Sequence, residues 1–213
     1  METNWAVEHL QVIRTLMERS AVYRRALAPV MVLTGVIGIL AALAGWLAQI
    51  KSPEAFAIYW LAVSLVAVLC ALLLVRRQAF KEGEPFWSPP TRRVTQALLP
   101  PLAGGFILSV IFLFQPASNS PHFEQATELA GLPAVWVILY GCGLHAAGFF
   151  MPRGVKLFGW VFVLCGCGLL TLGVPSWPRP LDYAEGVMGL FFGALHLGYG
   201  TYLYFTEQGK NAA

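Results

Sequence analysis

The sequence predicts an all-α membrane protein, with six transmembrane helices preceded by an N-terminal amphipathic helix at the membrane interface. Of its 213 residues, 57% are hydrophobic and only 12% are charged, which is about half the charged share of a soluble domain. Apolar runs of roughly 20 residues, the length that crosses a bilayer as a helix, recur along the chain. Basic residues occur in alternate loops between these runs. No segment outside the runs is long enough for a separate soluble domain.

Residues 1–27 form the predicted N-terminal segment, and residues 4–26 have the pattern of an amphipathic helix. One half of this helix would be apolar and the other half polar. The apolar half holds Trp5, Leu10, Val12, Ile13, Leu16, Met17, Ala21 and Tyr23. A helix of this kind either lies in the membrane interface or packs its apolar face on a partner or on the bundle. Charged residues interrupt the segment, which is not typical of a signal peptide.

The predicted bundle occupies residues 28–205 and is followed by a cytoplasmic tail, residues 206–213. The expected spans are approximately 28–50, 54–75, 94–115, 129–150, 156–174 and 186–205. All four cysteines, Cys70, Cys142, Cys165 and Cys167, lie within these apolar runs. Because none lies in a loop, the sequence predicts no disulfide framework.

The basic residues predict the orientation, because Lys and Arg accumulate on the cytoplasmic side of a membrane. If the N-terminus is inside, the outside loops hold Lys51 and Arg179, and the other twelve of the 14 Lys and Arg residues lie inside. One missed or invented span would disrupt this alternation, so the charges also support the span count. Both termini are therefore expected in the cytoplasm. The expected anchors at the membrane interface are Trp5, Arg24, Arg25, Arg76, Arg77, Arg92, Arg93, Arg153 and Lys156.

Two proline motifs concern the third span. Ser88 followed by Pro89 is typical of a helix start, with serine as cap and proline in the first turn. Pro100-Pro101 either kinks the helix, as in the broken helices of transporters, or marks the start of the membrane helix proper. We favour the second interpretation, because proline fits the first turn of a helix.

Three stretches, PFWSPPTRRVTQALLPPLAGG, VWVILYGCGLHAAGFFMPRG and GALHLGYG, resemble a family of uncharacterised bacterial integral membrane proteins with six spans. The resemblance extends over most of the chain. It implies a bacterial source and a location in the cytoplasmic membrane. It implies no activity and assigns no role to any residue.

Two histidines within predicted spans are candidate functional residues, because polar groups inside a membrane are costly. His145 lies in the fourth span and His196 in the sixth, and Cys142 lies three residues before His145 on the same helix face. Nitrogen and sulfur ligands suit haem iron or a transition metal. One hypothesis is therefore a cofactor site with His145 and His196, with Cys142 as a further metal ligand. The alternative, which we favour because no ligand pair has a diagnostic spacing, is that the histidines hydrogen-bond between helices and the cysteines pack.

Pairs of small residues four apart occur in most predicted spans. Such pairs allow close helix packing within the bundle or form the seam of a homo-oligomer. They are Gly38 and Ala42, Ala41 and Gly45, Gly105 and Ser109, Gly143 and Ala147, and Gly189 and Gly193.

No Asp or Glu is expected in the middle of a span. Glu54, Glu124, Glu128, Asp182 and Glu185 all fall at or beyond the expected outer boundary. A proton- or sodium-coupled carrier usually keeps a carboxylate within the membrane, so this pattern argues against a coupled transporter. The sequence also contains no HExxH motif and no phosphate-binding glycine loop.

These observations favour a non-enzymatic membrane protein, either an accessory or regulatory protein or one that allows small solutes to permeate. Its expected partners are the lipid bilayer and a second copy or another membrane subunit, and nothing in the sequence indicates nucleic acid. The first alternative is a haem- or metal-binding redox protein that uses His145 and His196. The second alternative is a small secondary transporter.

Overall fold

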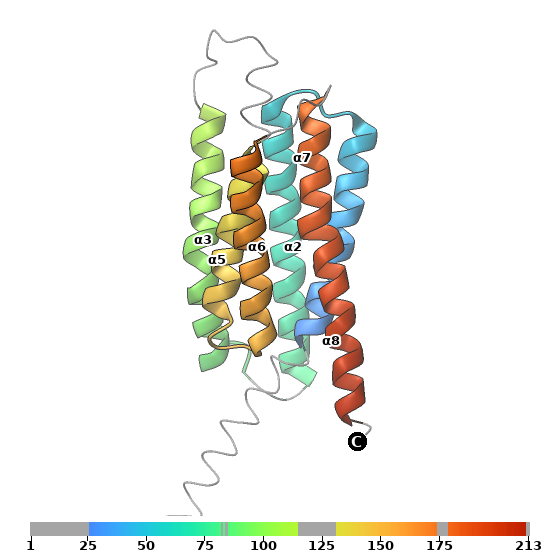
Figure 1. The fold of residues 1–213 in the computed structure, drawn as a ribbon. Helices are drawn as coiled ribbons and strands as arrows, with labels where there is room; N and C mark the ends of the chain where they lie inside the picture. The colour runs from blue at the N-terminus through green and yellow to red at the C-terminus, as the bar shows by residue number, and fades with distance from the viewer. Residues whose placement is uncertain (1–25, 82, 84, 115–130, 174–178, 212–213) are drawn as a thin grey trace, which may run out of the picture.

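The computed structural model describes residues 26–81, 83, 85–114, 131–173 and 179–211, and the regular structure in these ranges is entirely helical (Figure 1). The all-α prediction is therefore confirmed for this part of the chain. The predicted amphipathic helix lies almost wholly outside the described residues, as do the anchors Trp5, Arg24 and Arg25 and the loop of residues 115–128.

Each predicted span contains helix. The first helix is Ala26–Ala48, and it is followed by α2 (Pro53–Lys81), α3 (Pro89–Phe114), α5 (Leu132–Ala147), α6 (Arg153–Leu172), α7 (Pro180–Met188), the π-helix η1 (Gly189–Leu195) and α8 (His196–Asn211). The last three elements follow one another without a gap and form one rod, residues 180–211, which we call the C-terminal rod (Figure 1).

Among the described residues, four helices are long and apolar enough to cross a membrane. They are Ala26–Ala48, α2, α3 and α6. Helix α5 has 16 residues, which corresponds to roughly 24 Å at 1.5 Å per residue, less than the hydrocarbon core of about 30 Å. The C-terminal rod is long enough as a whole, but η1 divides it into shorter pieces.

Serine and proline define several helix starts, as the sequence predicts for Ser88 and Pro89. Helix α3 begins at Pro89, and the Ser88 hydroxyl lies 2.9 Å from that of Thr91. At the start of α2, the amide of Ala55 donates to Ser52 Oγ at 3.1 Å. A serine cap and a proline in the first turn both suit a helix end, because the first amide groups have no partner within the helix.

The interpretation of Pro100-Pro101 as a helix start is wrong. Both prolines lie inside α3, which begins about three turns earlier at Pro89. Each proline lacks an amide hydrogen and so leaves one carbonyl of the preceding turn without its helical donor. Pro101 packs against α5: a Cβ placed on Gly143 would lie 3.6 Å from Pro101 Cβ. The neighbouring helix therefore stabilises a segment that local propensity disfavours.

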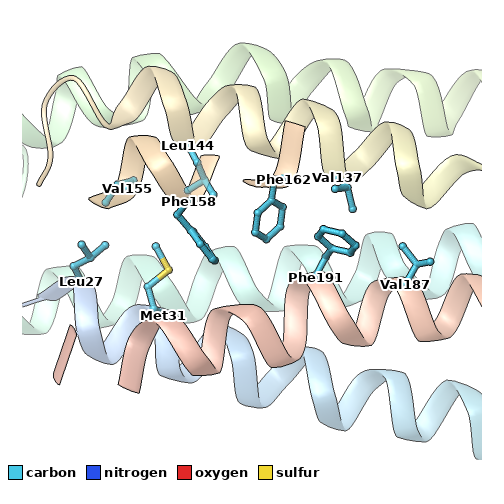
Figure 2. Packing of buried hydrophobic residues seen from close by; sticks show 9 residues of the cluster. All are labelled: Leu27, Met31, Val137, Leu144, Val155, Phe158, Phe162, Val187 and Phe191. Carbon is cyan, nitrogen blue, oxygen red and sulfur yellow. The ribbon is translucent and has the colours of Figure 1, made fainter. Parts of the chain in front are cut away.

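Helix α5 packs against both α6 and α3, and one apolar core joins α5, α6, the first helix and the C-terminal rod. Figure 2 shows side chains from all four elements, with Phe162 of α6 opposite Phe191 of the rod. The centroids of these two rings are 5.3 Å apart, in an edge-to-face arrangement. Phe162 and Val137 are fully buried at the centre of this cluster. Aromatic pairs of this geometry add about 0.5–1.5 kcal/mol beyond the area they bury.

The first helix and the C-terminal rod approach each other through glycines. Gly38 faces the backbone of Phe192, and a Cβ on Gly193 would lie 2.9 Å from the Ile39 amide nitrogen. A Cβ on Gly189 would lie 2.8 Å from Ala42 Cβ. We call this contact the glycine seam. It confirms that small residues of the predicted pairs pack within the bundle, where they let backbones come close.

Helices α2 and α3 present large apolar faces to the surroundings. Only 6% of the most apolar window of α2 is buried inside the bundle, and its mean hydropathy is 2.7. Leu65, Leu69 and Leu73 are each more than half exposed. An apolar surface of this extent is costly in water and stable in hydrocarbon. Long apolar helices with such exposed faces identify the chain as a membrane protein.

The described basic anchors lie at helix ends that share one end of the bundle. Arg76 and Arg77 are in the last turns of α2, Arg92 and Arg93 are near the start of α3, and Arg153 begins α6. Figure 1 shows these helix ends together with the C-terminus at the bottom of the bundle. These arginines are all exposed.

The contact of the first helix with the C-terminal rod, the glycine seam, continues at Gly200 and predicts different effects for two substitutions in α8. Gly200→Ala would place a Cβ 2.7 Å from the backbone nitrogen of Val32, and we expect such overpacking to lower the free energy of unfolding by about 1–3 kcal/mol. Gly198 has open space around it, so Gly198→Ala should be neutral or stabilise the helix by up to about 1 kcal/mol. Denaturant titration in mixed micelles measures both. Equal effects would contradict the packing described for the seam.

Candidate functional site

His196 and Ser109 are the two polar residues of the described bundle with no exposed surface. His196 follows η1 directly and lies at the junction of that π-helix with α8. Its Nδ1 is 2.8 Å from the carbonyl oxygen of Phe191, and its Nε2 is 2.8 Å from the hydroxyl of Tyr140 on α5. The imidazole therefore bonds within its own rod on one side and to α5 on the other.

These two hydrogen bonds define the tautomer of the neutral ring. A carbonyl oxygen only accepts hydrogen bonds, so the proton is on Nδ1 and is donated to Phe191. Nε2 is then the acceptor, and the Tyr140 hydroxyl donates to it. Both ring nitrogens of His196 consequently have partners, as buried polar atoms in proteins usually do.

The imidazole of His196 bonds back to the π-helix that precedes it. The backbone N–H of His196 donates to the Gly193 carbonyl, and the Nδ1–H of its side chain donates to the Phe191 carbonyl, five residues earlier in the π segment. A π segment inside an α-helix is costly and is found frequently at functional sites. Here the side chain of His196 supplies a donor where the register of the helix changes.

Aromatic rings enclose His196 on several sides. The ring centroids of Tyr140, Phe158 and Phe162 lie 5.3, 5.3 and 5.4 Å from that of the imidazole. Phe192 stacks on it with an interplanar angle of 16°. This apolar surrounding strengthens the hydrogen bond to Tyr140, and it makes the loss of either partner costly.

His145 has a different environment near the end of α5. It is partly buried, and its Nδ1 has no hydrogen-bond partner. Its ring lies edge-to-face with Phe149 at 5.4 Å and with Trp160 at 5.3 Å between centroids. The ammonium of Lys156 lies 3.6 Å from the centre of the Phe149 ring, in a cation–π contact.

The aromatic and hydrogen-bonding contacts of the two histidines involve different residues. Cys142, Cys165 and Cys167 are exposed on the outside of the bundle, and Cys70 is partly exposed. Within the described ranges, no three His, Cys, Asp or Glu side chains are grouped closely enough to hold a metal ion. Haem or a metal on His196 would also have to displace Tyr140 from Nε2. The site with Cys142, His145 and His196 stays a prediction, whereas the hydrogen bond between helices is confirmed for His196.

Glu185 is a buried polar residue that the sequence interpretation did not single out. It was expected at the outer boundary of the sixth span, but α7 begins at Pro180, and the Glu185 side chain is only 3% exposed. Its Oε2 accepts a hydrogen bond from Trp60 Nε1 at 3.1 Å, whereas Oε1 has no partner. One sequence signal indicated the burial of Glu185: Leu181 and Met188 lie on the same helix face as Glu185, and both are apolar.

Other polar side chains also join helices. The Tyr59 hydroxyl on α2 donates to the carbonyl of Ala41 on the first helix at 2.6 Å. The Trp136 indole on α5 donates to Ser109 Oγ on α3 at 2.9 Å, and that hydroxyl donates to the Gly105 carbonyl at 2.7 Å. Each bond satisfies a polar group that hydrocarbon cannot solvate. The hydroxyl of Tyr59 and the indole of Trp136 thus connect neighbouring helices.

A small cavity of about 80 Å³ lies at one end of α5 and α6. Its lining includes Pro133, Ala134, Leu169, Tyr183 and Val187, and it is largely apolar. Neither Glu185 nor either of the two histidines lines it.

No protein-family model matches the chain, and the searches of curated proteins and of solved structures found no significant match. The interpretation of the site therefore rests on the geometry described above.

The His196–Tyr140 bond predicts a loss of stability in Tyr140→Phe. The substitution keeps the ring but leaves His196 Nε2 buried without a donor, which should cost about 1–3 kcal/mol in the free energy of unfolding. Tyr204→Phe is the matched control, because Tyr204 lies in α8 and is 52% exposed, and it should change stability by less than about 0.5 kcal/mol. Denaturant titration of both variants in mixed micelles provides the measurement. If Tyr140→Phe behaved like the control, the hydrogen bond would not contribute to folding.

Proposed function

We propose that the chain is a six-span integral protein of a bacterial cytoplasmic membrane, with both termini in the cytoplasm. Helices in all six predicted spans support the span count, although α5 is short and the C-terminal rod is divided by η1. The exposed arginines at one end of the bundle support the orientation, because basic residues favour the cytoplasmic side. The bacterial source rests on the sequence resemblance. The N-terminal segment would lie at the inner interface as an amphipathic helix, anchored by Trp5, Arg24 and Arg25.

Within that membrane, the chain acts as a non-enzymatic protein through its helix packing, as an accessory or regulatory component. The observation that carries this proposal is that four buried or partly buried side chains, those of His196, Tyr59, Trp60 and Trp136, are engaged in bonds between helices. Polar groups committed in this way specify which helices are neighbours. A permeability role for small solutes is the other form of the same proposal.

The partner in this proposal is a second copy or another membrane subunit. The exposed faces of α2 and α3 are the surfaces that such a partner would cover, because these are the least buried of the four membrane-length helices in the described bundle. In lipid, association between such faces depends on packing and on polar contacts, since hydrocarbon already solvates apolar side chains.

The proposed topology can be tested with reporter fusions. A green fluorescent protein fused after Ala213 should fluoresce, because it folds in the cytoplasm. Alkaline phosphatase inserted in the loop of residues 115–128 should be active, because that loop is expected outside. Fusions after Lys81 and after Lys51 provide an inside and an outside control. The reverse pattern at the C-terminus and this loop would overturn the orientation.

The accessory role predicts that the protein is part of a larger complex and that it does not transport small solutes. After gentle solubilisation from its native membrane, the protein should run in a complex larger than one chain. Proteoliposomes of the purified chain should swell no faster than empty liposomes in gradients of glycerol or urea. Faster swelling would identify the permeability role instead, and a purely monomeric chain without flux would contradict both forms of the proposal.

The haem or metal alternative has its own readout on the same sample. Absorption spectroscopy and metal analysis of the purified protein should give a colourless and metal-free preparation if the histidines only pack and hydrogen-bond. A Soret band that disappears in His196→Ala would instead establish the redox protein.

A further inference from the structure

The carboxyl group of Glu185 lies where three helices meet near one end of the bundle. Glu185 belongs to α7, Trp60 belongs to α2, and Gly45 belongs to the first helix. The first helix ends, α2 begins and α7 begins at this end, at the top of Figure 1. At 1.5 Å per residue, Glu185 lies roughly 8 Å along the helix from Pro180, the first residue of α7.

The space for this carboxyl group depends on a glycine. A Cβ placed on Gly45 would lie 2.5 Å from Glu185 Oε1 and 2.8 Å from Oε2. No larger residue fits at this position without displacing the carboxyl group. The surrounding side chains are apolar and buried: Ala41, Phe56, Leu181, Ala184 and Met188 pack with Trp60 in one cluster. The carboxyl group therefore occupies a closely fitted and largely apolar site.

Only one of the two carboxyl oxygens has a partner. Oε2 accepts from the Trp60 indole, and Oε1 has none although it is buried. An ionised carboxylate in such a place lacks the two or three donors or the cation that usually compensate a buried charge. A proton on Oε1 removes the charge and leaves Oε2 as the carbonyl oxygen that accepts from Trp60. The geometry thus suits a carboxylic acid.

The titratable groups around this site supply no compensating positive charge. On α7, Asp182 is paired with Arg179 at 2.9 Å. On α2, the Tyr59 hydroxyl is bonded to the Ala41 carbonyl, and Glu54 is exposed. Residues 26–48 of the first helix include no titratable side chain. Lys51, between the first helix and α2, is exposed, and among the described residues no basic side chain forms an ion pair with Glu185.

We propose that Glu185 is a reversible proton-binding site of this protein. A proton from the water at this end of the bundle binds the carboxylate at Oε1 to form the acid, and it returns to the water when the acid ionises. This role goes beyond the packing function proposed above and does not depend on it. Buried carboxyl groups inside membrane bundles are typical elements of proton relays and of proton-linked transport.

Infrared difference spectroscopy of the protein in lipid bilayers tests this proposal. We expect the carbonyl-stretch band of a protonated carboxylic acid at neutral pH, its loss as the pH is raised, and its return on lowering the pH. The band should be absent in Glu185→Gln at every pH. It should remain in Glu54→Gln, a matched control in which an exposed glutamate of α2 is changed. Absence of the band in the wild-type protein, or its persistence in Glu185→Gln, would overturn the proposal.

A second pair of variants keeps the proposal testable if Glu185→Gln does not fold. Trp60→Phe removes the indole N–H that donates to Oε2, so the acid band should shift to higher frequency. Trp87→Phe is the control, because Trp87 is 58% exposed and lies outside this cluster, and it should leave the band in place. A band that does not move in Trp60→Phe would show that the signal comes from another group.

Discussion

The close approach of the first helix to the C-terminal rod is the constraint on which the rest of the structure depends. In lipid, apolar side chains gain little by leaving hydrocarbon for a helix interface, so backbones must come near enough for dense van der Waals contact. Gly35, Gly38 and Gly193 allow this approach, because a side chain at any of them would meet the backbone of the other helix. The partners of Glu185 and the core around Phe191 both follow from the resulting position of the rod.

The π-helix in the middle of the rod changes the helical register between α7 and α8. A straight α-helix turns its residues by a constant angle, whereas a π segment changes that angle over a short stretch. The carbonyl of Phe191, within this segment, receives the Nδ1–H of His196, and the ring then points its Nε2 at Tyr140 of α5. Because aromatic rings surround the imidazole, the bond to Tyr140 joins the rod to α5 in a region that water does not reach.

The same rod carries two buried polar groups of different character. His196 is fully paired, and it functions in the fold as a connection between helices. Glu185 is only half paired, and one of its oxygens faces an apolar site next to Gly45. A paired group stabilises one arrangement of helices, whereas an unpaired acid retains the capacity to exchange a proton. The rod thus carries a fully paired histidine that connects helices and, separately, a half-paired carboxyl group.

The sequence by itself determined the fold class and the approximate position of each helix in the described chain. Apolar runs predict the spans, and Ser88 followed by Pro89 predicts the start of α3. The sequence also identified His196 as a polar residue that hydrogen-bonds between helices. It further identified small residues that allow helices to pack closely.

Only the tertiary structure decided which residues meet. It placed Tyr140 against His196 and Trp60 against Glu185, and it showed Pro100 and Pro101 inside α3. The physical reason is that every face of a membrane helix can be apolar, so hydropathy does not encode how the helices are rotated about their axes. Contacts between residues as far apart as Trp60 and Glu185 depend on that rotation. In this chain the rotation is set by glycine contacts and by a change of helical register.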